Sequence, residues 1–220
     1  MLDYLNDIDT EVLLAINGLH GTFQDAWWWL VSAKWASALL VLALAWILLY
    51  QNRRHAVLVL AMLVLTFVLA DQLSSGLVKP LVERLRPTWD HSLDNMVHTV
   101  NNYRGGMFGF VSSHAANSFA AATLIALIMR HRLVTISIFV WALLQCYSRV
   151  YLGVHYPGDI LGGIVIGTVV GWLTWLLMRW IQCRWHLPEG YYTRTDAVVM
   201  TSSLGLTLLC LLIATLSQTL

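Results

Sequence analysis

The sequence predicts an all-α fold, a polytopic membrane helical bundle with about six transmembrane helices and an N-terminal interfacial helix. Of the 220 residues, 58% are hydrophobic and 11% are charged, whereas soluble domains average about 45–50% apolar and about 25% charged residues. The apolar residues form separate runs, most of them near the ~20 residues that a helix needs to cross a bilayer. We therefore expect one integral-membrane domain spanning residues 1–220.

Residues 1–34 are expected to lie in the membrane interface. Apolar and acidic residues alternate at helical spacing, and Trp27, Trp28 and Trp29 follow, a composition that suits an interfacial helix. A cleavable signal peptide would begin with basic residues. The start of this chain instead carries the acidic residues Asp3, Asp7, Asp9 and Glu11, so we expect the N-terminus to be kept.

Six apolar runs follow, at residues 36–50, 56–78, 113–129, 133–152, 160–180 and 197–216. The connections 51–55 and 130–132 are short and basic, and the longer connection 181–196 is also basic, which predicts that all three face the cytoplasm. The 79–112 loop and the 149–159 turn then lie together on the opposite face. Within the fifth run, small residues recur at Gly163, Gly167 and Gly171, which favours close packing against a helix of the same chain.

The overall charge and the cysteines exclude several kinds of site. A net charge of +1 gives no basic footprint for nucleic acid. The three cysteines, Cys146, Cys183 and Cys210, match no disulfide framework and no metal-ligand spacing.

The first of three polar stretches begins at the end of the second apolar run. Lys79 and Arg86 are seven residues apart and Pro87 follows. In a helix ended by Pro87, both cations would point the same way and could grip one dianionic group. Ordinary interfacial cations would give the same pattern.

The second stretch is Ser112, Ser113 and His114, at the start of the third run. Ser112 is a candidate N-cap, and the free N–H groups of a helix N-terminus attract anions. A simple helix cap explains these residues equally well when they are taken alone.

The third stretch holds Arg149, His155 and Asp159. His155 and Asp159 are one helical turn apart, so the carboxylate can orient one imidazole nitrogen and leave the other as a nucleophile or base. Arg149 can complete a phosphate-binding site. A histidine paired with an acid for structural reasons alone would look the same.

Together, Lys79-x6-Arg86-Pro87, Ser112-x-His114 and Ser148-Arg149-x5-His155-x3-Asp159 resemble the three-part signature of the type 2 phosphatidic acid phosphatase family, which is related to soluble vanadium haloperoxidases. The order and the internal spacings match. The resemblance covers roughly residues 56–175, which we take as the catalytic core, with 79–112 and 149–159 as the active-site segments.

This resemblance implies a metal-independent lipid phosphate phosphatase that uses no cofactor. His155 would attack phosphorus and form a phosphohistidine, Asp159 would orient it, and His114 would protonate the leaving oxygen. Charge stabilisation of the transition state would come from the phosphate-binding residues Lys79, Arg86, Ser112, Ser113 and Arg149.

Two positions depart from the family pattern. The family usually has Pro-Ser-Gly-His where this chain has Val111, Ser112, Ser113 and His114. Glycine allows the backbone to approach a phosphate closely, so the serine at 113 adds a side chain and a hydroxyl at a critical point. In the preceding loop, Arg104 is a candidate for contact with the lipid head group, although loop residues of this kind are often only solvated.

The expected substrate is a phosphate or diphosphate on a membrane lipid, cleaved at the outer face of a bacterial inner membrane. Undecaprenyl diphosphate is the preferred candidate, with lipid A phosphate and phosphatidylglycerol phosphate or phosphatidate as alternatives.

Two other function classes explain the polar residues less well. An intramembrane protease using Ser112 or Ser113 with His155 would leave the three cations and Asp159 unexplained. A transporter would place ionisable residues near helix midpoints, whereas here they gather at helix ends. The oligomeric state is left open.

Overall fold

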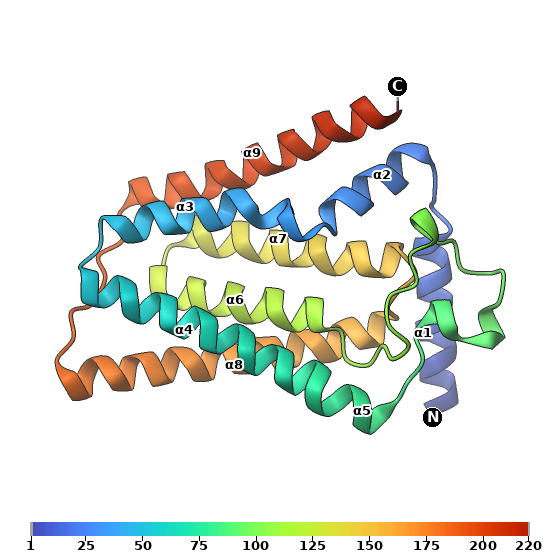
Figure 1. Cartoon of the computed structure of the whole chain (residues 1–220), viewed down its shortest axis with the longest axis horizontal. Coiled ribbons are helices and arrows are strands. Elements are labelled where there is room, and N and C mark those ends of the chain that lie inside the picture. Colours follow the sequence, from blue (N-terminus) through green and yellow to red (C-terminus); the bar gives the residue numbers. More distant parts are fainter. Residues whose placement is uncertain (1, 220) are drawn as a thin grey trace.

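The computed structural model describes residues 2–219, and its regular structure is helical (Figure 1). The helices are α1 (Leu2–Asn17), α2 (Thr22–Val31), α3 (Ala38–Leu49), α4 (Arg53–Asp71), α5 (Lys79–Val82), α6 (Ser113–Met129), α7 (Arg132–Tyr151), α8 (Pro157–Trp185) and α9 (Arg194–Thr219). A π-helical stretch, Gln72–Val78, joins α4 to α5. The predicted all-α membrane fold is confirmed, because each of the six apolar runs forms a helix.

Four continuous helices are long and apolar enough to cross a bilayer, namely Arg53–Val82, Arg132–Tyr151, Pro157–Trp185 and Arg194–Thr219. The pair Thr22–Val31 and Lys34–Leu49 meets the same criterion as one broken span, with a bend of 61°. The apolar helix α6 is shorter, at 17 residues. Residues 2–219 therefore contain four or five spans by length, and the predicted six are reached only when α6 is included.

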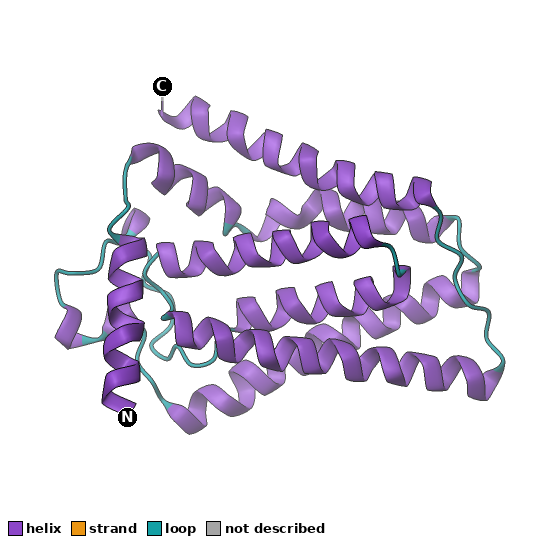
Figure 2. Cartoon of the chain, turned by 180° about the vertical axis from the view of Figure 1, so that it is seen from behind, coloured by secondary structure: helices purple, strands orange, loops and turns teal. Residues whose placement is uncertain are grey.

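The N-terminal segment differs from the prediction of one interfacial unit over residues 1–34. Gly18 and Gly21 lie in the break between α1 and α2, so the segment forms two separate helices. Of the two helices in this segment, α1 lies across the end of the bundle, transverse to its long helices, as Figures 1 and 2 both show. Helix α2 instead leads through the 61° bend into α3 and packs against α9 and α7.

Helix α6 is the centre of the bundle, and it packs against α4, α7 and most closely against α8. A methyl group on Gly163 would lie 2.5 Å from the backbone oxygen of Ser112, and one on Gly171 would lie 2.5 Å from that of Ala120. The small residues of α8 therefore let the two helices approach, as predicted. This contact fixes the start of α6 against the start of α8, where two of the three polar stretches lie.

Candidate active site

The three polar stretches meet at one end of the bundle, beside α1 (Figure 1). Helix α5 ends there, α6 and α8 begin there, and α7 ends there. The predicted helix from Lys79 to Arg86 is wrong. Helix α5 stops at Val82, Glu83 takes a left-handed conformation with φ 51°, and Leu85 pairs with Phe108 in an antiparallel bridge. Arg86 therefore reaches the site from extended backbone.

His155 and Asp159 form a buried pair at the start of α8. The Nδ1 atom of His155 lies 3.3 Å from Oδ2 of Asp159, and the two side chains are 1% and 0% exposed. Asp159 also accepts from the backbone N–H of Tyr156 at 3.1 Å, and its carbonyl accepts from the N–H of Ser112 at 2.9 Å. Since Nδ1 faces the carboxylate, Nε2 is the imidazole nitrogen left to react.

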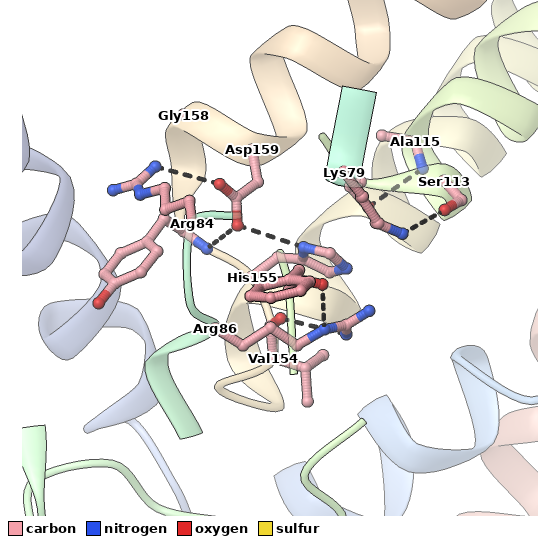
Figure 3. A network of polar contacts seen from close by, with 12 residues as sticks. Lys79, Arg84, Arg86, Ser113, Ala115, Val154, His155, Gly158 and Asp159 are labelled. Atoms are coloured by element: carbon pink, nitrogen blue, oxygen red, sulfur yellow. Dashed lines mark hydrogen bonds and ion pairs between the residues drawn. The ribbon is translucent and has the colours of Figure 1, made fainter. Parts of the chain in front are cut away.

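Positive charge surrounds this imidazole (Figure 3). Burial lowers the pKa of His155 well below its ordinary value, and the charges of Arg86, Arg149 and Lys79 lower that pKa further. The cations predicted from separate parts of the sequence are therefore close enough to act on one histidine. Neutral imidazole keeps the lone pair that a nucleophile needs.

Arg86 and Arg149 are fixed in place by neutral partners. Arg86 is 8% exposed and donates from Nε to the carbonyl of Phe108 at 3.1 Å. Arg149 is 3% exposed and donates to the hydroxyls of Ser32 at 2.5 Å and Tyr103 at 3.0 Å. Its Nε is buried and has no partner within residues 2–219. Buried donors are nearly always paired, so this one is suited to an anion.

Lys79 contacts the residue at which the chain departs from the family pattern. Its Nζ donates to Oγ of Ser113 at 2.6 Å, and that hydroxyl is 2.7 Å from Oγ of Ser75. The serine at 113 therefore binds the ammonium group of Lys79 instead of leaving backbone alone at this point.

Ser112 and His114 lie at the N-terminus of α6, and the predicted N-cap is confirmed. The Ser112 hydroxyl accepts from the N–H of Ala115 at 3.4 Å. His114 lies near enough to Arg149, His155 and Arg86 for their charges to act on it. Within the described part of the chain, neither Ser112 nor Ser113 hydrogen-bonds to His155, so the geometry of a serine protease dyad is not present.

Sequence reasoning missed Arg84 and Asp9. Arg84 donates from Nη1 to Oδ1 of Asp159 at 3.0 Å and from Nη2 to Oδ2 of Asp9 at 2.7 Å. Arg84 lies inside the first polar stretch, so its position between Lys79 and Arg86 was a usable signal. Asp9 carried none, because it is 75 residues away from Arg84 in the sequence.

Arg104 is exposed on the 88–110 loop, and its guanidinium lies 5.7 Å from the ring centre of Trp89. Contact with a head group stays a prediction for this residue.

Metal independence of the reaction also stays a prediction. Among residues 2–219, no three His, Cys, Asp or Glu side chains are grouped closely enough to hold a metal ion.

Comparison with known proteins decides the family. The model of the PAP2 superfamily matches residues 55–183, more than half of the chain. The chain belongs to the PAP2 superfamily. The family predicted from the three stretches is thereby confirmed, and so is the prediction that this chain is a phosphatase.

Among PAP2 relatives, the lipid A 4'-phosphatase of Bacteroides thetaiotaomicron is 38% identical over 186 residues, covering 84% of this chain and 83% of that protein. The lipid A 4'-phosphatase of Porphyromonas gingivalis is 32% identical, covering 84% and 78%. The crystal structure of a PAP2-type phosphatidylglycerolphosphate phosphatase from Bacillus subtilis has a TM-score of 0.61 at 24% identity, covering 82% of this chain and 87% of that chain. This last likeness shows the shared fold.

The prediction that undecaprenyl diphosphate is the preferred substrate is not supported. The undecaprenyl-diphosphatase BcrC of Bacillus subtilis matches over only 64 residues, or 29% of this chain, at 34% identity. The relatives with the longer matches favour the alternative, a lipid A phosphatase.

Proposed function

We propose that this PAP2 phosphatase removes the 4'-phosphate of lipid A. The substrate assignment rests on the similarity to a lipid A 4'-phosphatase over 84% of the chain. This similarity extends beyond the 55–183 segment that matches the superfamily. The observation that supports phosphate chemistry is the buried pair of His155 and Asp159, with Arg86, Arg149 and Lys79 near enough for their charges to lower the pKa of His155.

The reaction proceeds in two steps. The Nε2 lone pair of His155 forms a bond to phosphorus, the bond from phosphorus to the sugar oxygen breaks, and His114 gives that oxygen a proton. A water oxygen then forms a bond to phosphorus, the bond from phosphorus to Nε2 breaks and returns its electron pair to the imidazole, the water's proton passes to His114, and inorganic phosphate leaves. The negative charge of the bound phosphate compensates the surrounding cations, which favours the protonated form of His114 before the first step.

The cations supply most of the transition-state stabilisation. Phosphoryl transfer spreads charge over three equatorial oxygens, and fixed donors around those oxygens lower the barrier. Arg149 offers its unpartnered Nε, while Arg86 and Lys79 add positive charge from other elements. Ser112, Ser113 and the N-terminus of α6 complete the phosphate site, and Asp159 stabilises the positive imidazole ring of the intermediate.

The domain assignment follows the same proposal. The whole chain is one phosphatase domain, with residues 56–175 as the catalytic core and 79–112 and 149–159 as its active-site segments. It lies in a bacterial inner membrane with the site facing the periplasm. The basic connections at the opposite end of the bundle support this orientation.

The orientation can be tested with a single cysteine introduced into the 88–110 loop. A membrane-impermeant thiol reagent should label this cysteine in intact spheroplasts. Labelling only after lysis would contradict the orientation.

The substrate is tested by phosphate release in detergent. Purified protein is assayed with lipid A, undecaprenyl diphosphate, phosphatidylglycerol phosphate and phosphatidate at matched surface concentrations. We expect kcat/KM to be at least about tenfold higher for lipid A, because its sugar offers contacts that the other lipids lack. Mass spectrometry of the product should show loss of the 4'-phosphate and retention of the 1-phosphate. A faster reaction with undecaprenyl diphosphate, or loss of the 1-phosphate, would contradict the assignment.

A further inference from the structure

We infer that Asp9 of the N-terminal helix positions the pair His155 and Asp159 through Arg84. The inference rests on the proposed role of His155 as nucleophile. Both oxygens of the Asp9 carboxylate are used: Oδ2 accepts from Nη2 of Arg84 at 2.7 Å, and Oδ1 accepts from the N–H of Gly158 at 2.6 Å.

Each partner of Asp9 leads to Asp159. The other terminal nitrogen of Arg84 donates to Oδ1 of Asp159 at 3.0 Å, and Gly158 precedes Asp159 at the start of α8. Asp9 therefore holds Asp159 through its side chain and through its backbone. The second oxygen of Asp159 faces Nδ1 of His155 at 3.3 Å, so a shift of the carboxylate would turn the imidazole. Figure 3 shows Arg84, Asp159 and His155 in this order.

The network is shielded from water. The side chains of Asp9, Arg84 and Asp159 are 12%, 23% and 0% exposed, and the ring of Tyr156 covers the Arg84 guanidinium at 4.1 Å from the ring centre. Ion pairs on the open surface contribute little, whereas hydrogen bonds in a low-dielectric network reinforce one another. A methyl group on Gly158 would lie 2.8 Å from Oδ2 of Asp9, so the contact is also closely packed.

Asp9 lies outside residues 55–183, the segment that matches the superfamily. The N-terminal helix therefore adds a component to the common catalytic core. Helix α1 is then part of the active-site structure as well as a segment at the membrane interface. Asp9 and Arg84 are positioning residues, because they act on the reaction through Asp159.

The test measures kcat and KM with the lipid phosphate that the wild-type protein hydrolyses fastest. We expect Asp9→Asn to lower kcat roughly tenfold with little change in KM, since a small misplacement of reacting groups slows the chemical step. The double variant Asp9→Asn/Arg84→Gln should be no slower than Arg84→Gln alone, because the two residues act as one unit. Gly158→Ala, which displaces the Asp9 carboxylate and keeps its charge, should also lower kcat.

Asp7→Asn is the matched control. Asp7 is exposed on the same helix and lies about 200° around the helix axis from Asp9, so its removal should leave kcat unchanged. Wild-type kcat in Asp9→Asn, an equal loss in Asp7→Asn, or additive losses in the double variant would overturn the positioning role. Absence of any lipid phosphatase activity in the wild-type protein would instead overturn the proposed function, and the positioning role with it.

A separate cavity carries a second proposal, which rests on lipid A as the substrate. It has a volume of about 390 Å³ and lies between α2, the 98–101 segment and the end of α9. Its lining includes Thr22, Asp25, Trp29, His98, Asn101 and Gln218. We propose that this cavity binds the saccharide of the substrate beyond the sugar that carries the reacting phosphate.

The cavity adjoins the phosphate site. Trp29 packs edge-on against Tyr103, with ring centres 5.6 Å apart, and the Tyr103 hydroxyl accepts from Arg149 at 3.0 Å. A wall of two aromatic side chains therefore separates the cavity from a cation of the active site.

The lining favours an uncharged polar ligand. It contains the carboxylate of Asp25 but no lysine or arginine, which disfavours a second phosphate. Hydroxyl, amide and carboxylate groups suit sugar hydroxyls, and an indole presents both an apolar face and an N–H donor. Asp25 is held rigid by the Tyr151 hydroxyl at 2.6 Å and by Nε2 of His98 at 2.9 Å, as a preorganised site requires.

Two adjacent asparagines provide a matched test. Asn101 lines the cavity and Asn102 is not among its lining residues, yet both have left-handed backbones, with φ of 52° and 55°. Glycine accepts this conformation, so Asn101→Gly and Asn102→Gly remove one side chain each without strain. The measured quantity is kcat/KM for lipid A and for phosphatidate, which carries no sugar.

We expect Asn101→Gly to lower kcat/KM for lipid A about three- to tenfold, the value of one hydrogen bond, and to leave phosphatidate unaffected. Asp25→Asn should show the same selectivity, and Asn102→Gly should change neither substrate. Equal losses for both substrates, or no loss in either cavity variant, would overturn the saccharide site alone. Failure of the wild-type protein to hydrolyse lipid A would overturn the proposed function as well.

Discussion

Replacement of His155 by alanine is expected to abolish phosphate release from the lipid substrate. We expect kcat to fall by roughly four orders of magnitude or more, the scale of loss when a catalytic nucleophile is removed. The physical reason is that Nε2 of His155 supplies the lone pair for the bond to phosphorus, while Nδ1 of the same ring lies 3.3 Å from Oδ2 of Asp159 and is oriented by it. The measurement is malachite-green detection of phosphate with purified protein in detergent.

Folding must be controlled in this experiment, because His155 is 1% exposed and alanine leaves both a cavity and a buried carboxylate without its partner. His155→Asn keeps part of the volume and can still donate to Asp159, so it should fold with a thermal midpoint close to that of the wild-type protein and remain inactive. Substantial turnover in a folded His155→Asn or His155→Ala protein would exclude His155 as the nucleophile.

Replacement of Arg149 by alanine is expected to lower kcat about 10²- to 10³-fold, the usual effect of removing one donor that stabilises transition-state charge. Arg149→Lys should recover little of this loss. Lysine carries a single point charge and cannot reproduce the planar fork whose terminal nitrogens reach Ser32 and Tyr103. The measurement is steady-state kinetics on the same lipid substrate.

Arg132→Ala is the matched control for charge on the same helix. Arg132 begins α7 at the opposite end from Arg149 and is exposed, so this variant should retain wild-type kcat. Added methylguanidinium should partly restore Arg149→Ala, because the buried space left beside Tyr103 fits that group. Full activity of Arg149→Lys would show that positive charge alone is sufficient and that the unpartnered Nε has no part in binding phosphate.

Much of the fold was predictable because apolar runs of membrane length form helices wherever they occur. All six runs appear as helices close to their predicted bounds. The N-terminal segment was harder, since Trp27, Trp28 and Trp29 suit an interfacial helix and one end of a bent span equally well. Only packing against α9 distinguishes the two, and the local sequence does not encode that contact.

The candidate site was predictable where spacing within a short stretch carries the geometry. His155 and Asp159 lie one turn apart, and the local start of α8 brings them together. Arg86 was predicted to reach the site from a helix, and it reaches the site from extended backbone. This conformation depends on the bridge between Leu85 and Phe108, which the local sequence does not reveal. Neither the contact of Asp9 with Arg84 nor that of Ser32 with Arg149 has a local signal, since each joins residues far apart in the sequence.

Trapping the covalent intermediate tests directly whether His155 is the nucleophile. Protein mixed with lipid A labelled with ³²P at the 4' position is quenched within milliseconds in alkali, where phosphohistidine is stable, and the modified peptide is sequenced by mass spectrometry. We predict that the label is bound to His155, is released by acid, and is absent from His155→Asn. Label on another residue, or rapid turnover by a protein that never becomes labelled, would show that His155 does not attack phosphorus within this group of cations.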